Sequence, residues 1–168
     1  KTYNLQLKTS SYFPAMNQLF IRQAQISDIP QIQRVRNAVK ENTLSDPALV
    51  PDGDVADYIT RRGRGWVSLQ GELVTGFAIV SLLDHNVWAL FMNPGFDKQG
   101  VGRMLHDQMM DWYFEQSDEQ VWLSTTPGTR AEGFYRKAGW QVAGTYGKNE
   151  LKFILTSEEW LRQKTANL

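Results

Sequence analysis

The sequence predicts a single α/β (α+β) domain, with a central sheet of about six to seven mostly antiparallel strands flanked by helices. Three observations favour this class. The chain has 168 residues, enough for one domain with a substantial core. Short apolar segments typical of strands alternate with segments whose apolar residues recur at helical spacing. Several strand segments are joined by only a few polar residues, a spacing that favours antiparallel hairpins.

The first part of the chain predicts a strand, a helix and a second, short helix. Residues 19–24 (LFIRQA) form a short apolar strand segment. Ser27 is a suitable N-cap for the helix that follows, because its hydroxyl can accept a hydrogen bond from the first turn. The apolar side chains at helical spacing along this helix are Ile29, Ile32, Val35 and Val39. The short second helix places three side chains on one side: Val55, Tyr58 and Ile59.

Three strand segments follow closely in the middle of the chain, at 65–70, 73–83 and 87–92. The polar links 70–72 (QGE) and 84–86 (DHN) are short enough to be hairpin turns. The sequence therefore predicts an antiparallel meander of three strands here.

The next part predicts a helix, a strand and another helix. The helix that opens in the glycine-containing stretch 96–108 carries an apolar stripe of Met104, Leu105, Met109 and Trp112. A strand is expected at 121–126. Thr129 with Glu132 matches a capping box that starts the second helix, and Gly139 can end it.

The end of the chain predicts two more strands, at 140–146 and 150–156, and a short closing helix around Glu158 to Arg162. Thr156 with Glu159 would cap that helix. We find no internal repeat, low-complexity tract or linker, which agrees with one domain.

The composition excludes several classes of protein. It is 42% hydrophobic and 21% charged, ordinary for a globular chain. Eighteen basic residues balance eighteen acidic ones, so no overall field favours nucleic acid or an anionic membrane. There is no cysteine, and His85 and His106 are the only histidines, so no metal site is expected.

The N-terminal residues 1–15 lack a clear period and the apolar core of a signal peptide. We interpret them as an appended or mobile extension, and 16–168 as the domain. The longest apolar-leaning run, 73–83, is too short to cross a bilayer. The expected localisation is therefore cytoplasmic.

The stretch "FDKQGVGRMLHDQ" at 96–108 raises the question of phosphate binding. A helix N-terminus offers unpaired N–H groups to an anion, and Gly100 and Gly102 would let it approach the backbone. Lys98 and Arg103 could add positive charge. The pattern alone also matches an ordinary strand-to-helix turn that uses glycine for conformational freedom.

Two well-known phosphate loops do not match this stretch. A Walker loop requires Lys and Ser or Thr directly after the last glycine, and here Arg103 and Met104 follow Gly102. A dinucleotide-binding fingerprint requires a third glycine where Leu105 stands, and it belongs early in a parallel βαβ unit.

The order of elements from 19 to 155, with three motifs, resembles the GNAT superfamily of acetyl-CoA-dependent N-acetyltransferases. "VWALFMNPGFDKQGVGRML" is similar to the family's fourth strand and pyrophosphate loop, and "VWLSTTPGTRAEGFYRKAGW" to its fifth strand and following helix. "IRQAQISDIPQIQRVRNAV" looks like its opening strand and helix. The resemblance implies a GNAT-like mixed sheet, acetyl-CoA as the cofactor, and direct transfer of its acetyl group to a primary amine in a ternary complex.

By this resemblance, the pantetheine arm of the cofactor would lie where the fourth and fifth strands separate, facing main-chain groups around Phe91 and Met92. Lys98 would add charge, and Phe134 could contact the cofactor. The backbone that would hold the pyrophosphate comprises Gln99, Gly100, Val101, Gly102 and Arg103. Asp97 stands where the family has Arg or Gln, and its charge would oppose a nearby phosphate.

Tyr135 is the candidate general acid, because the family's tyrosine in a similar "FY…GF" pattern often donates the proton to the coenzyme A thiolate. Its residue type alone is more typical of a core aromatic, and the family match is what favours the catalytic role. Neither histidine is assigned as the general base: His85 falls in a predicted hairpin turn, and His106 is expected at the surface of its helix. By the resemblance, Arg130 or Lys137 could reach the adenosine 3′-phosphate, but both are expected to be solvated surface charges.

The acceptor side is less defined by the sequence. The stretch from Glu41 to Thr60 has several acids and no Lys or Arg, which either favours a cationic amine or reflects capping of turns and helices. Trp66 and Trp88 could line an acceptor pocket or belong to the core. The expected partners are a small-molecule or peptide amine and, since dimers are frequent in the resembled family, a second copy of the chain. The alternative function is a non-catalytic acyl-CoA-binding or protein-interaction module, a reading that Asp97 favours.

Overall fold

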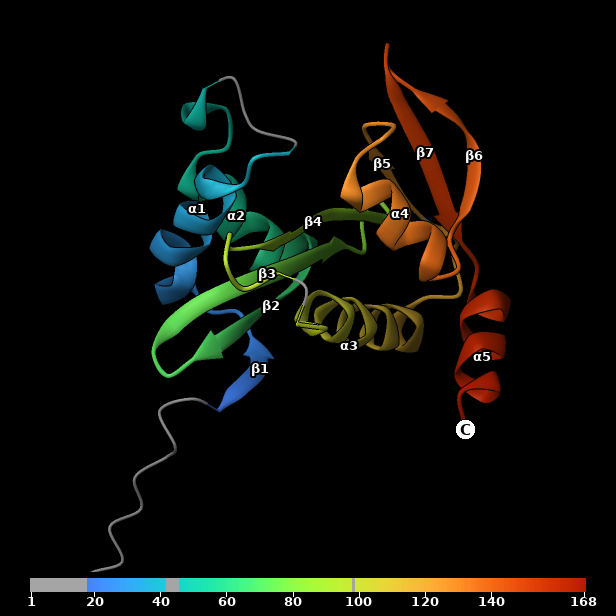
Figure 1. The fold of residues 1–168 in the computed structure, drawn as a ribbon, viewed down its shortest axis with the longest axis horizontal. Coiled ribbons are helices and arrows are strands. Elements are labelled where there is room, and N and C mark those ends of the chain that lie inside the picture. The colour runs from blue at the N-terminus through green and yellow to red at the C-terminus, as the bar shows by residue number, and fades with distance from the viewer. Residues whose placement is uncertain (1–17, 42–45, 98) are drawn as a thin grey trace, which may run out of the picture.

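The computed structural model describes residues 18–41, 46–97 and 99–168, and in these the chain forms one mixed sheet with flanking helices (Figure 1). The strands are β1 (Leu19–Gln23), β2 (Gly63–Gln70), β3 (Leu73–Ser81), β4 (Asn86–Met92), β5 (Val121–Thr125), β6 (Gln141–Tyr146) and β7 (Glu150–Leu155). The helices are α1 (Ile29–Ala38), α2 (Asp52–Asp57), α3 (Val101–Gln116), α4 (Arg130–Lys137) and α5 (Ser157–Ala166).

The strand order is β1-β2-β3-β4-β5-β7-β6, and β4 with β5 is the parallel pair, while the other neighbours are antiparallel. This confirms the predicted fold class, a mixed and mostly antiparallel sheet between helices. The predicted meander of β2, β3 and β4 is also confirmed. The hairpin of β6 and β7 lies on the opposite side of the molecule from α1, at the right of Figure 1.

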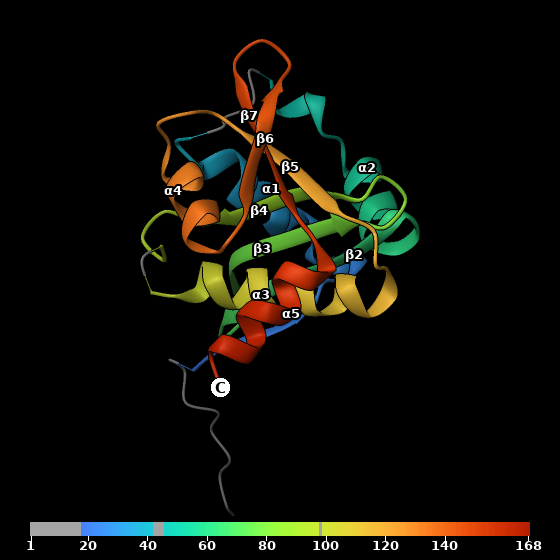
Figure 2. The same cartoon turned by 90° about the vertical axis from the view of Figure 1, so that its right-hand side faces the viewer.

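Two hydrophobic cores lie on opposite faces of the sheet. On one face α1 and α2 pack on the sheet, and Ile32 and Val35 meet Phe77 there. On the other face α3 crosses beneath β2 and β3, with α4 and α5 beside it (Figure 2). Met109 of α3 is fully buried in this second core. Burial on both faces explains why β3 is apolar along nearly its whole length.

The start of α1 differs from the prediction, because Ser27 is not its N-cap. Residues Ile26–Asp28 form a 3-10 turn, and α1 begins after Asp28. The Asp28 carboxylate accepts the Gln25 N–H at 2.7 Å and pairs with Arg22 at 2.7 Å. That carboxylate therefore satisfies the free N–H of the turn, and the Ser27 hydroxyl is not needed for it.

Of the two hydrogen bonds of the capping box predicted for α4, only one forms. Thr129 accepts from the N–H of Glu132 at 3.4 Å, but the Glu132 carboxylate accepts from Gly128 at 2.6 Å instead of reaching back to Thr129. Gly139, at φ +84°, ends the helix as predicted, since the left-handed region favours glycine.

The cap of α5 is the complete box that was predicted. Thr156 Oγ1 accepts from the N–H of Glu159 at 3.2 Å, and the Glu159 carboxylate accepts from the N–H of Thr156 at 3.0 Å. The helix itself extends beyond the predicted range and ends at Ala166.

The buried stripe of α3 is rotated relative to the predicted one. Met104 is 53% exposed and Trp112 only partly buried. The fully buried side chains of this helix are Leu105, His106, Met109, Met110 and Tyr113. The surface position expected for His106 is therefore wrong.

The extension predicted at 1–15 lies outside the described residues, and the domain boundary stays a prediction. In the part of the chain that the structure describes, every helix is too short or too polar to span a bilayer. In the same residues no three His, Asp or Glu side chains converge as a metal site.

Candidate active site

The centre of the sheet is interrupted between β4 and β5. In the described residues these strands share a single register pair, Asn86 with Trp122. Beyond it they separate, and a narrow gap of about 70 Å³ opens between Leu90 and Phe91 on one side and Leu123 on the other. Backbone groups of β4 that face this gap have no ladder partner in β5, so they can bind an amide-containing ligand.

A β-bulge in β4 adjusts which side chains face each core. Ile79 pairs with Ala89 and the next β3 residue, Val80, pairs with Val87, so Trp88 is the extra residue. Trp88 and Phe91 both pack with the α1 side of the sheet, whereas Leu90 packs with the α3 side. Bulges commonly re-aim side chains beside binding sites.

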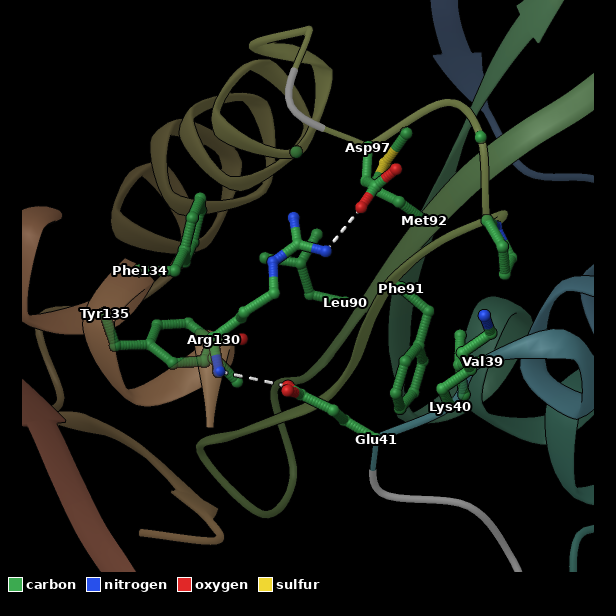
Figure 3. A pocket seen from close by; sticks show the side chains of 14 residues that line it. Val39, Lys40, Glu41, Leu90, Phe91, Met92, Asp97, Arg130, Phe134 and Tyr135 are labelled. Carbon is green, nitrogen blue, oxygen red and sulfur yellow. Dashed lines mark hydrogen bonds and ion pairs between the residues drawn. The ribbon is translucent and has the colours of Figure 1, made fainter. Parts of the chain in front are cut away.

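A cleft of about 510 Å³ opens where the two strands separate (Figure 3). One wall is the end of α1 and the residues after it, and the floor is the end of β4. The other wall is α4, and the turn before α3 closes one end. The side chains discussed below are those of Glu41, Phe91, Asp97, Arg130, Phe134 and Tyr135.

The glycine-containing stretch places the N-terminus of α3 at this end of the cleft. Gly100 is the N-cap at φ +79°, a conformation that favours glycine. Gly102 lines the cleft, and a Cβ there would meet Met92 and Phe134 only at ordinary contact distance. The protein itself therefore leaves room at Gly102, beside N–H groups that have no partner within the helix.

The predicted cofactor residues have different positions in the structure. Phe91, Met92, Gly102 and Phe134 line the cleft, whereas Gln99 and Gly100 are exposed beside it and Val101 packs into the core. The Nε of Arg103 donates to Asp107 at 2.8 Å, so this side chain is held along the helix, and Arg103 does not line the cleft. Lys98 lies outside the described residues.

Asp97 forms an ion pair with Arg130 across the mouth of the cleft (Figure 3). The hydrogen bond from Arg130 holds the pKa of Asp97 below its usual range. The repulsion that Asp97 would exert on a phosphate is thus offset by a cation from α4. The Arg130 side chain is 60% exposed, as expected of a solvated charge, and the structure adds that it lines the cleft and pairs with Asp97.

Tyr135 is 6% exposed and borders both the cleft and the gap between β4 and β5. Its ring lies edge-on to Phe134 and Trp140, with centroids 5.2 and 5.6 Å away. Burial raises the pKa of its hydroxyl. The raised pKa means that the hydroxyl keeps its proton at neutral pH. Among the described residues this hydroxyl has no hydrogen-bond partner, so it remains available to a ligand in the cleft.

His106 is sealed beneath Phe134 and Tyr135 and cannot act as the base. Its Nε2 accepts from the Trp140 indole at 2.9 Å, and its Nδ1 lies 2.7 Å from Asp107. An indole only donates, so the imidazole proton belongs on Nδ1, where it is donated to Asp107. Burial lowers the pKa of His106, although Asp107 opposes the shift. His106 is a neutral structural group of the core.

His85 lies in the turn between β3 and β4, as expected. Its φ is +51°, and its Nδ1 is 2.8 Å from the hydroxyl of Tyr113. It does not line the cleft.

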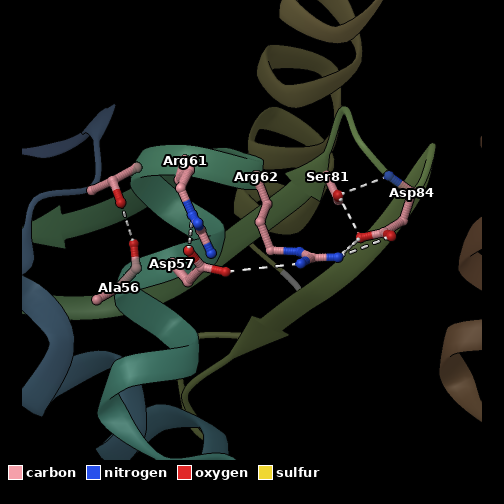
Figure 4. Close-up of polar contacts among 7 residues, drawn as sticks. Ala56, Asp57, Arg61, Arg62, Ser81 and Asp84 are labelled. Carbon is pink, nitrogen blue, oxygen red and sulfur yellow. Dashed lines mark hydrogen bonds and ion pairs between the residues drawn. The ribbon is translucent and has the colours of Figure 1, made fainter.

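The acids between Glu41 and Thr60 mostly serve local structure. Asp46 caps a 3-10 turn by accepting from Ala48, and Asp52 accepts from Gln33. Asp57 pairs with Arg61, and Figure 4 shows it linked through Arg62 to Asp84. Capping, ion pairing and a side-chain hydrogen bond therefore explain Asp46, Asp57 and Asp52 in turn. Glu41 is the one of them that lines the cleft.

The two tryptophans considered for the acceptor site have different positions. Trp66 is buried in the α3-side core. Trp88 stacks on Tyr58 at 4.0 Å between centroids, carries Arg36 on its ring at 4.9 Å and borders the narrow gap.

Comparison with known proteins agrees with this architecture. The model of the acetyltransferase (GNAT) family matches residues 32–140, more than half of the chain. The chain is similar to a PaiA N-acetyltransferase from Thermoplasma acidophilum in complex with coenzyme A, at 14% identity and a TM-score of 0.73 over 83% of this chain and 99% of that one. No curated protein matches the sequence.

Two further solved structures share the fold. The ribosomal-protein-S18-alanine N-acetyltransferase of Escherichia coli has 18% identity and a TM-score of 0.65, over 82% of this chain and 91% of that one. Ard1 of Thermoplasma volcanium has 20% identity and a TM-score of 0.68, over 82% and 97%. At these identities the likeness establishes the fold.

Proposed function

Because this chain belongs to the acetyltransferase (GNAT) family, we propose that it is an N-acetyltransferase that moves the acetyl group of acetyl-CoA to a primary amine by direct transfer in a ternary complex. The acceptor would be a small-molecule or peptide amine. The proposal rests above all on Tyr135, whose protonated hydroxyl borders the gap between β4 and β5.

The residues around the cleft suit acetyl-CoA. The N-terminus of α3 offers N–H groups to the pyrophosphate, with Gly100 and Gly102 leaving the backbone accessible. Arg130 supplies a guanidinium at the same end, which compensates for Asp97. The unpaired edge of β4 near Phe91 and Met92 offers backbone groups to the pantetheine arm.

The chemistry requires a donor for the thiolate that leaves when the amide forms. Burial raises the pKa of Tyr135, so the phenol stays protonated at neutral pH and can donate to the departing sulfur. A backbone N–H on the open edge of β4 can stabilise the oxyanion that forms on the acetyl carbonyl. Tyr135 is therefore assigned the role of general acid.

Calorimetry with acetyl-CoA and thiol release with an amine panel test the proposal. A suitable panel is spermidine, L-alanine, an alanine-initiated peptide and Nα-acetyl-lysine. We expect binding, and turnover with at least one amine. Arg130→Met should weaken coenzyme A about tenfold, the range of one partly exposed charge-assisted contact, and leave pantetheine, which lacks phosphates, unaffected.

Two results would contradict the proposal. If acetyl-CoA does not bind at millimolar concentration, it is not the cofactor of this protein and the proposal is wrong. Binding without turnover on the whole panel would favour the non-catalytic acyl-CoA-binding alternative.

A further inference from the structure

A general base is the missing part of the proposed reaction. Alkylamines have a pKa of ~10.4, so near neutral pH most of the acceptor is an ammonium that cannot attack a thioester. Some group must bind this cation next to Tyr135 and take its proton. The titratable or charged side chains that line the cleft are Lys40, Glu41, Asp97, Arg130 and Tyr135.

Four of these five groups are unsuited to the task. Lys40 and Arg130 are cations and have no lone pair to accept a proton. Asp97 already has a guanidinium partner in Arg130. Tyr135 holds its proton for the thiolate. The two histidines are also excluded, since His106 is sealed in the core and His85 lies outside the cleft.

Glu41 has the geometry that the base requires. It follows α1, on the wall opposite Tyr135, and its side chain reaches across the cleft toward α4 (Figure 3). One carboxylate oxygen accepts the backbone N–H of Arg130 at 3.0 Å, which fixes the group at the start of the helix that carries Tyr135. Within the described residues no Lys, Arg or His pairs with this carboxylate, so its second oxygen is open to an ammonium.

We propose that Glu41 binds the ammonium of the acceptor and removes its proton, as the general base of the proposed acetyl transfer. This inference rests on the proposed function. The acceptor gives one proton to the Glu41 carboxylate, and the neutral nitrogen forms the new C–N bond to the acetyl carbon. When the C–S bond breaks, the thiolate receives the Tyr135 proton, and the second nitrogen proton replaces it. Glu41 then releases its proton to solvent, one per turnover.

Glu41→Gln tests this role with little structural change, because the amide oxygen can still accept the Arg130 N–H. With the best amine of the panel above, we expect kcat/KM at pH 7 to fall roughly a hundredfold to ten-thousandfold, the range of general base catalysis. The deficit should shrink to less than about tenfold near pH 10, where free amine becomes abundant as the pH approaches ~10.4. Acetyl-CoA affinity and thermal stability should stay as in the wild type.

Asp54→Asn is the matched control. Asp54 is an exposed acid of the same acidic stretch, and it does not line the cleft. Its replacement should leave kcat/KM unchanged, whereas an equal loss in both variants would assign the effect to a general negative field and overturn the role of Glu41. An unchanged rate in Glu41→Gln, or a loss that is equal at pH 7 and pH 10, would overturn it as well.

The inference and the proposed function fail in different ways. If the wild type acetylates no amine, the proposed function is wrong and the role of Glu41 falls with it. If the wild type is active and Glu41→Gln matches it at every pH, only the role of Glu41 is wrong.

Discussion

Strand β4 is attached to its two neighbours in different ways. On one side it pairs with β3 along a register from Gly76–Met92 to Ser81–Asn86. On the other side it meets β5 at the single pair of Asn86 with Trp122. The β1–β4 region is therefore one hydrogen-bonded unit, whereas the β5–β7 region is held against that unit by side-chain packing and a few separate hydrogen bonds and ion pairs, not by a continuous ladder. The cleft occupies the place where the ladder stops.

This difference matters for the proposed chemistry because the walls of the cleft come from different regions. Glu41 and Phe91 belong to the β1–β4 side, and Arg130 and Tyr135 to the β5–β7 side. Beyond the strand pair, the two sides are joined by the core around α3, where Trp140 donates to His106. The open sheet edge leaves backbone groups of β4 available to a ligand, and aromatic contacts with Phe134 and Trp140 hold the Tyr135 ring.

After Glu41→Gln, Tyr135→Phe gives the largest expected effect, and it acts on catalysis alone. The hydroxyl has no partner in the described protein, so its removal should leave the free energy of unfolding within about 0.5 kcal/mol of wild type. We expect kcat to fall tenfold to about a thousandfold with little change in acetyl-CoA affinity. Steady-state kinetics and calorimetry measure both. Unchanged turnover would remove Tyr135 from the mechanism.

His106→Ala should have the next largest effect, a loss of stability in the core around α3 that joins the two regions. We call this core the joint. The change opens a cavity and leaves the buried Trp140 N–H without a partner, so we expect a loss of roughly 2 to 4 kcal/mol in the free energy of unfolding. Chemical denaturation measures it.

Thr75→Val is the control for His106→Ala within the β1–β4 region. Thr75 is fully buried and its hydroxyl lies 2.8 Å from that of Ser68, but long backbone ladders hold these strands in place. We expect a loss of about 1 kcal/mol. Equal losses in the two variants would show that side-chain contacts matter as much in the β1–β4 region as at the joint.

The same contrast explains which features could be predicted from the sequence. Strand segments, hairpin links and the cap of α5 depend on neighbouring residues, and the structure confirms them. The resemblance to the family assigns Tyr135 and the glycine stretch to one site, and in the structure Gly102 and Tyr135 line the same cleft. The contacts of Arg130 with Asp97 and Glu41 join segments far apart in the chain, and no local pattern reveals such pairs.

The burial of His106 did have a local signal. Counting i, i+3, i+4 and i+7 from His106 reaches Met109, Met110 and Tyr113, and this stripe is the one that is buried. The predicted stripe through Met104 and Trp112 differs from the buried one because histidine is polar and is expected at the surface. His106 can be buried because both of its ring nitrogens have hydrogen-bond partners, Trp140 and Asp107.

An effect as small as that of Thr75→Val is expected from a pH dependence of stability that comes from the same histidine. Burial lowers the pKa of His106 in the folded state, so the unfolded chain binds the proton first as the pH falls through ~6.5. Stability should therefore decrease by about 1 kcal/mol between pH 7 and pH 5.5. The carboxylates whose pKa is lowered in the fold, such as Asp28 and Asp107, lose their contribution only at lower pH, because it is present above ~4. Denaturation curves at both pH values should show the decrease in the wild type and not in His106→Ala, and an equal decrease in both would assign it to another group.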